Sequence, residues 1–260
     1  MPFTVSHAAA VLLFRRLKLV WSAFIIGSMA PDFPYIIGNT EYRFVGHRLP
    51  GVVVFTIPAS LAVLWLYHNV IKRPMIGLLP GGVQARLRAQ VREDFQFGGA
   101  GRFLAIMVST VLGIATHVIW DAFTHAYTWP WRHFAWLRIH VPVPFVGLKP
   151  LYGVLQYTST VVGILALATW VWLWYARSAP QQQLLHKPAS KSRFGLALAM
   201  CTVAAVIGIV RAALLVGSPL APARADFFLL IFGVTTLAMA FWQLLVYCVL
   251  VSSYQVWILN

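Results

Sequence analysis

The sequence predicts an all-α, polytopic integral membrane protein with about five transmembrane helices. Of its 260 residues, 60% are hydrophobic and only 10% are charged, whereas a soluble domain usually carries about 25% charged residues. The apolar residues also gather in long runs, and a helix needs roughly 20 such residues to cross a bilayer. Together these observations exclude an ordinary soluble domain.

Two short apolar stretches come first, at residues 8–14 and 20–29, and each is too short to span a membrane. We expect them to form interfacial or re-entrant helices that end at the turn signal GSMAPDFP. One hairpin through both stretches is the alternative, and the charges of Arg15, Arg16 and Lys18 at its middle argue against it. Five longer runs are expected to span the membrane: residues 51–71, 103–123, 153–175, 194–216 and 227–251.

A polar segment at residues 180–193, PQQQLLHKPASKSR, divides the chain. Residues 1–179 form the predicted helical membrane domain with the candidate site, and residues 194–260 form a two-helix transmembrane hairpin. Lys and Arg are densest in residues 72–102 and 176–193, which lie on one side of the membrane. The positive-inside rule places these two loops in the cytoplasm and the N-terminal region outside.

The chain carries 20 Lys and Arg against six Asp and Glu, for a formal net charge of +14. Its basic residues lie in the links between apolar runs, which indicates membrane lipids as partners. Nucleic acid is not expected as a partner, because no stacking module or basic stripe stands apart from these loops. The two cysteines, Cys201 and Cys248, lie in apolar runs and form no disulfide or metal-binding motif.

Six residues stand out as candidate metal ligands. In the sequence THVIWDAFTH, residues 117, 121 and 125 are spaced to share one stripe of a helix. Three further residues precede the first predicted span, while THVIWDAFTH ends the second, which returns across the membrane. Counting spans therefore places all six on the same face of the membrane: His7, Asp32, His47, His117, Asp121 and His125.

Imidazole and carboxylate groups are usual ligands of Zn²⁺ and of related divalent ions. On a straight helix His117 and His125 are separated by about 12 Å, so one ion cannot easily bind both. Either one ion takes His117 and Asp121, or Asp121 bridges two ions with an imidazole at each end. The alternative without metal has Asp121 paired with His125 and each histidine in an ordinary interhelical hydrogen bond.

The segment WPWRHFAWLRIHVPVP, residues 129–144, follows the candidate ligands directly and is typical of an interfacial aromatic belt. A site next to this belt would lie at the depth of the lipid head groups, where a substrate can arrive from the bilayer. Arg43, Arg48 and Arg132 are candidates for holding a substrate phosphate, and lipid anchoring explains each of them equally well.

Several motifs resemble a bacterial membrane family of unknown function, domain of unknown function 4184. They are MPFTVSHAAAVL, GSMAPDF, GHR, THVIWDAFTH and PLYGVLQYTST, in this order, and the resemblance covers essentially the whole chain. More distantly, the chain is similar to an inner-membrane family described as metal-dependent hydrolases. It is also similar to the zinc-dependent phospholipase C and P1 nuclease group.

Two patterns carry the distant likeness. Asp32 is followed 15 residues later by His47, and His117 and Asp121 form an H-x-x-x-D pair. In those enzymes the corresponding residues bind zinc ions that hydrolyse phosphoesters. This chain lacks their later H-x-x-x-E pair and an N-terminal Trp ligand. The resemblance therefore implies one or two ions in place of three.

The resulting hypothesis is a membrane-bound, metal-dependent hydrolase of phosphoester bonds, with lipids among its substrates. We expect it in the bacterial cytoplasmic (inner) membrane, with the site on the extracytoplasmic face. The alternative is a non-enzymatic membrane protein whose His/Asp seam is structural or conducts protons or metal ions, since ionisable residues inside a membrane often mark such paths.

Overall fold

The computed structural model describes residues 4–36, 46–92, 94–144, 147–180, 191–217 and 222–259. This described part is helical apart from two short strands and the connecting loops, which confirms the predicted fold class. Contacts group the chain into two compact units. The first contains Met1–Phe33, Glu41–Leu61 and Phe97–Trp172, and the second contains Pro34–Thr40, Ala62–Gln96 and Leu173–Asn260.

Short helices begin the first unit, as the two short apolar stretches predict. The 3₁₀ helix η1 covers Thr4–Leu12 and helix α1 covers Trp21–Met29. The 3₁₀ turn η2 (Ala30–Asp32) and the one-turn helix α2 (Phe33–Ile36) follow. Pro31 and Pro34 lack the backbone N–H that a continuous helix would require here, so α1 ends and the chain turns.

Five helical stretches are long and apolar enough to cross a membrane, as predicted: Leu49–Leu78, Ala100–His133, Leu151–Arg177, Arg193–Val216 and Phe227–Ser252. The first joins five elements: α3 (Leu49–Gly51), the π-helix η4 (Val52–Thr56), α4 (Ile57–Leu66), the π-helix η5 (Tyr67–Ile71) and α5 (Lys72–Leu78). Pro58 removes one backbone donor from this stretch. The π-helical turn just before it is the kind of local adjustment that tolerates proline in membrane helices.

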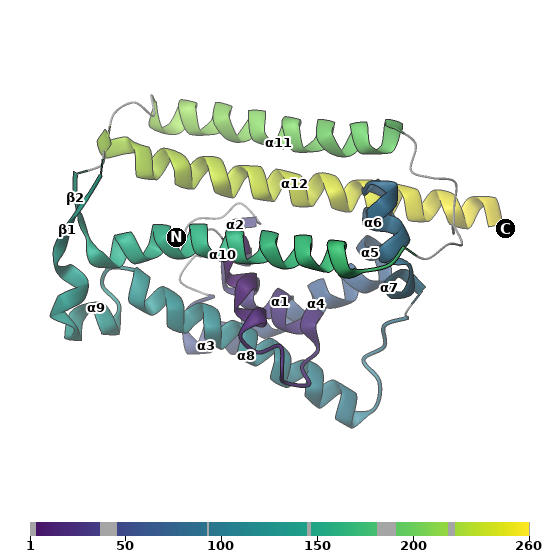
Figure 1. The fold of residues 1–260 in the computed structure, drawn as a ribbon, viewed down its shortest axis with the longest axis horizontal. Helices are drawn as coiled ribbons and strands as arrows, with labels where there is room; N and C mark the ends of the chain where they lie inside the picture. Colours follow the sequence, from purple (N-terminus) through teal and green to yellow (C-terminus); the bar gives the residue numbers. More distant parts are fainter. Residues whose placement is uncertain are drawn as a thin grey trace. The chain divides into compact units, whose positions relative to one another are not determined.

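The second stretch consists of α8 (Ala100–Thr124) and the short helix α9 (Trp129–His133). The 3₁₀ helix η6 (Ala135–Arg138) follows, and then an antiparallel hairpin of β1 (His140–Val143) and β2 (Gly147–Pro150), which Figure 1 shows. The sequence analysis did not predict these strands. Large aromatic side chains of this segment are exposed, including Tyr127 and Trp129, as an interfacial belt requires.

The remaining helices are α6 (Gly81–Arg86), α7 (Arg88–Arg92), α10 (Leu151–Arg177), α11 (Lys191–Val216) and α12 (Pro222–Leu259). Helices α11 and α12 run alongside each other in the second unit (Figure 1). Gly208 allows this close packing, since a Cβ there would lie 2.3 Å from the Thr236 hydroxyl oxygen. The predicted linker at residues 180–193 lies mostly outside the described residues, so the domain division that it implies stays a prediction.

The packing that matters for the site is that of α1 against α8 in the first unit. A Cβ at Gly27 would lie 2.4 Å from the carbonyl oxygen of Thr110, and one at Gly113 would lie 2.2 Å from that of Phe24. Small residues at such positions let two membrane helices approach until their backbones touch. The two glycines therefore fix α1 directly on the face of α8 that carries His117.

Candidate metal site

One buried stripe of α8 supplies the first two candidate ligands. The stripe consists of Ile106, Ser109, Thr110, Gly113, Ile114, His117, Asp121 and Thr124, which recur at helical spacing. His117 is completely buried and Asp121 is 6% exposed. Because the two are four residues apart, their side chains lie on the same face of α8 and can reach a common point.

The opposite side of the site comes from two turns that precede the first spanning stretch. The turn η2 carries Asp32, which is 1% exposed, and His47 lies just before α3. A Cβ at Gly46 would lie 2.2 Å from the carbonyl oxygen of Pro31, so only glycine allows these two turns to touch. This contact brings His47 beside Asp32.

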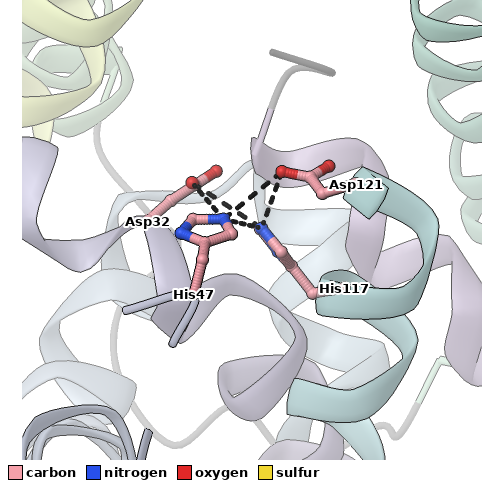
Figure 2. Close-up of side chains that lie close together, drawn as sticks. All are labelled: Asp32, His47, His117 and Asp121. Carbon is pink, nitrogen blue, oxygen red and sulfur yellow. Dashed lines mark hydrogen bonds and ion pairs between the residues drawn. The ribbon is translucent and has the colours of Figure 1, made fainter. Parts of the chain in front are cut away.

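The four side chains converge, as Figure 2 shows. The Nε2 atoms of His47 and His117 are 3.2 Å apart. Asp121 Oδ2 lies 3.3 Å from His47 Nε2 and 3.4 Å from His117 Nε2. Asp32 Oδ1 lies 3.8 Å and 3.7 Å from the same two nitrogen atoms. One ligand atom from each of the four residues lies within 4.8 Å of the other three.

These distances fit ligands of a shared ion better than direct hydrogen bonds. A charged N–H···O hydrogen bond is usually about 2.7–2.9 Å long, and the imidazole–carboxylate distances here are 3.3–3.8 Å. Four ligands placed tetrahedrally at about 2.0–2.2 Å from a zinc ion lie about 3.3–3.6 Å from one another. The buried Asp/His group could therefore hold a metal ion.

The charges of the site also favour a bound cation. In the described part of the chain, the ion pairs of Asp32 and Asp121 are all with histidines. Two buried carboxylates this close repel each other unless a positive charge lies between them. The Oδ1 atoms of both carboxylates are buried and make no hydrogen bond within the described structure, and such atoms usually mark a missing partner.

Two hydrogen bonds from outside the group orient its members. His117 Nδ1 lies 2.7 Å from the carbonyl oxygen of Ser28, which can only accept, so the N–H is on Nδ1. His117 Nε2 is then the nitrogen that faces the centre of the group. On the other side, the hydroxyl of Thr4 donates to Asp32 Oδ2 over 2.7 Å. Metal-binding histidines and carboxylates are typically held in this way.

His7 lies at the edge of the group. Its Nε2 is 3.4 Å from Asp121 Oδ1, and its ring stacks on that of His117 with 3.9 Å between the centroids. Burial lowers the pKa of His7, and this effect outweighs the opposing influence of the nearby carboxylates. Since burial favours the neutral imidazole, His7 is held in the form that can bind a metal.

His125 is close to the group without joining the four. Helix α8 ends at Thr124, and His125 has extended backbone angles of −122° and 146°. Its Nδ1 donates to the backbone carbonyl of Asp121 over 2.9 Å and lies 3.7 Å from Asp121 Oδ2. The helical stripe therefore ends at Thr124, before His125, and a role of His125 as a ligand stays a prediction.

The candidate phosphate-binding arginines are only partly described. Arg48 and Arg132 are exposed, Arg48 directly after His47 and Arg132 on α9. Arg43 lies outside the described residues. Thr4 and Ser28, which orient the candidate ligands, were not predicted from the sequence. No sequence signal marks them, since one acts from a residue 28 positions away and the other through its backbone carbonyl.

Comparison with known proteins identifies the family to which the chain belongs. The family model described as "Domain of unknown function (DUF4184)" matches residues 1–249. The chain belongs to this family. Comparisons with curated proteins and with solved structures gave no match. As a member of the DUF4184 family, the chain has Asp32, His47, His117 and Asp121 inside the matched region.

Proposed function

We propose that this DUF4184 protein is a metal-dependent hydrolase of phosphoester bonds, with membrane lipids among its substrates. The observation that carries the proposal is the convergence of two imidazole nitrogens and two carboxylate oxygens: the two nitrogens lie 3.2 Å apart and each lies 3.3–3.8 Å from both oxygens, close to the spacing around one four-coordinate ion. The metal is proposed as Zn²⁺, because a compact N₂O₂ set suits its tetrahedral preference.

A bound ion of this kind supplies a Lewis acid that polarises a phosphoryl oxygen and makes a water molecule nucleophilic near neutral pH. The role of the chain's own residues is to bind the ion and to hold the ligand side chains in position. His117 is fixed by the Ser28 carbonyl, and Asp32 is fixed by the Thr4 hydroxyl. Such preorganisation avoids the cost of arranging ligands during the reaction.

The proposal includes one or two ions. Asp121 presents Oδ2 to His47 and His117, while its Oδ1 lies 3.4 Å from His7 Nε2. A carboxylate with imidazoles on both oxygens suits a bridge between two ions, and paired ions stabilise displacement at phosphorus. In a two-ion form, His7 would be a ligand of the second ion.

Exposed cations and aromatic residues close in sequence to the site residues support a phosphorylated lipid as substrate. Arg48 adjoins His47, and Arg132 lies in the aromatic segment directly after α8. One arginine side chain can donate hydrogen bonds to two phosphate oxygens at once. Tyr127 and Trp129 provide exposed aromatic rings, which favour the depth of the lipid head groups. We propose the bacterial cytoplasmic membrane as its location, as the resemblance implies, and the distribution of Lys and Arg supports a site on the extracytoplasmic face.

A non-enzymatic role, in which the His/Asp seam is structural or conducts ions, is the competing function. An ion path requires ligand-like residues through the depth of the membrane. In the part of the chain that the structure describes, Asp32, His47, His117 and Asp121 form one compact group, which favours a binding site over a path.

The test uses full-length protein purified in detergent. Metal content is measured for the wild type, His117→Ala and Asp121→Ala, and hydrolysis is measured with a chromogenic phosphodiester and with phospholipid vesicles. His133→Ala is the matched control, since His133 is exposed and, among the residues that the structure describes, hydrogen-bonds only to the nearby Trp129 carbonyl.

We expect about one or two equivalents of metal in the wild type and in His133→Ala, and a loss of metal and hydrolysis in the other two variants. Metal below about half an equivalent, unchanged by the substitutions, refutes the metal site. Bound metal without hydrolysis, together with proton or metal flux in liposomes, favours the competing function.

A further inference from the structure

The N-terminal 3₁₀ helix holds a residue that acts on the site from outside the group of candidate ligands. Thr4 is the first residue of η1. Its hydroxyl donates to Asp32 Oδ2 over 2.7 Å, across 28 residues of sequence. An ionised carboxylate can only accept hydrogen bonds, so the Thr4 hydroxyl must be the donor.

Because of this hydrogen bond, the two carboxylate oxygens of Asp32 have different surroundings. Oδ2 is occupied by Thr4, while Oδ1 is buried and makes no hydrogen bond in the described structure. Oδ1 is also the atom that lies 3.7 Å from His117 Nε2 and 3.8 Å from His47 Nε2. Without a donor on Oδ2, the carboxylate is free to turn about its Cβ–Cγ bond and to present both oxygens.

We propose that Thr4 is a positioning residue that commits Asp32 to binding the metal ion through Oδ1 alone. This inference rests on the proposed metal site and adds to it the denticity of one ligand. The placement of η1 supports it, because Gly163 of α10 lets η1 pack closely: a Cβ there would lie 2.9 Å from the Ser6 backbone oxygen. This packing holds η1, and with it Thr4, in place beside α10.

The chemistry predicts the size of the effect. Hydrogen-bond partners of metal ligands typically contribute about 10- to 100-fold to metal affinity. Thr4→Val keeps the shape of the side chain and removes its donor, whereas Thr4→Ser keeps the donor. We therefore expect zinc affinity to fall about 10- to 100-fold in Thr4→Val and to return to within a few-fold of the wild-type value in Thr4→Ser.

The experiment measures two quantities on the full-length protein in detergent. Zinc affinity comes from competition with a chromogenic chelator, and the absorption spectrum of the Co²⁺-loaded protein reports ligand number and geometry. Thr202→Val is the matched control, since the hydrogen bond of Thr202 within the described part of the chain is to the Leu198 carbonyl, one turn away on α11. Thr4→Ala, which also lacks the donor, replaces Thr4→Val if the latter does not fold.

The expected result is weaker zinc binding together with a changed Co²⁺ spectrum in Thr4→Val, both restored in Thr4→Ser and absent in Thr202→Val. A purely structural role would lower the stability of Thr4→Val and leave the Co²⁺ spectrum of its folded fraction unchanged, which overturns the inference. Wild-type affinity and spectrum in Thr4→Val also overturn it, and leave the metal site intact. A wild-type protein that binds no metal refutes the proposed function and this inference together.

Discussion

Replacing Asp121 with asparagine tests the metal site most directly. The substitution keeps the size of the side chain and removes the charge of a group that lies 3.3 Å and 3.4 Å from the Nε2 atoms of His47 and His117. Binding of Zn²⁺ to four ligands is worth about 10–16 kcal/mol in small zinc proteins, so one ligand in four accounts for about 2.5–4 kcal/mol. The expected loss of affinity is about 100- to 1,000-fold.

This loss converts into a difference in thermal stability. At a free zinc concentration of 100 times its dissociation constant, the wild type gains about 2.7 kcal/mol of unfolding free energy from the ion. At the same concentration, a variant with 100-fold weaker binding gains only about 0.4 kcal/mol. Thermal unfolding in detergent, with zinc and with a chelator, measures both values.

The metal-free protein should not show this zinc-dependent difference. In chelator, Asp121→Asn removes the repulsion from Asp32 but also the ion pairs of Asp121 with His7, His47 and His117, so only the gain on adding zinc reports the loss of the ligand. Asp94→Asn is the control, because Asp94 is exposed and pairs with Arg73. An Asp121→Asn variant that keeps the full zinc-induced stabilisation contradicts the proposed site.

Three further predictions concern the surroundings of the site. Gly113→Ala should lower the unfolding free energy by about 1–3 kcal/mol, since its Cβ would meet the backbone of α1. Gly101→Ala is the control and should leave the unfolding free energy unchanged, because a Cβ at Gly101 would meet no atom within 4 Å. Chemical denaturation measures both values. His125→Ala should bind zinc within a few-fold of the wild-type affinity in a chelator competition, whereas an equal loss in His125→Ala and His117→Ala would show that both are ligands. Burial lowers the pKa of His7, so the unfolded chain takes up a proton at higher pH than the folded one. Metal-free stability should therefore fall as the pH drops below about 6.5, and a His7→Gln variant should show a weaker pH dependence of its unfolding temperature.

The spanning helices could be predicted from the sequence because the lipid environment allows few backbone conformations. Backbone groups in a bilayer must pair within the chain, so a long apolar run becomes a helix. The predicted span at residues 153–175 differs from Leu151–Arg177 by only two residues at each end. The first span begins two residues before the predicted start and ends seven residues after the predicted end, because Lys72 and Arg73 continue the helix to Leu78.

The candidate ligands were also indicated by the sequence, in which six His and Asp residues were expected on one face, and their role as ligands stays a prediction. The structure brings Asp32, His47, His117 and Asp121 into one group and places His7 beside Asp121. What the sequence did not indicate is the backbone contact that creates the group. Gly46 and Gly113 look like ordinary glycines until the carbonyl groups opposite them are known. The end of α8 at Thr124, which sets His125 apart, was likewise not marked by a glycine or proline.

The candidate ligands are supplied from both sides of the spanning stretch Leu49–Leu78, and 70 residues separate His47 from His117. During synthesis, the early ligands Asp32 and His47 therefore leave the ribosome well before α8 can supply theirs. An ion can be held tightly only after that later helix has been threaded into the lipid and has met the N-terminal arm. If the site binds metal, uptake of the ion is a late step in biogenesis, and a loaded protein is one whose insertion has been completed.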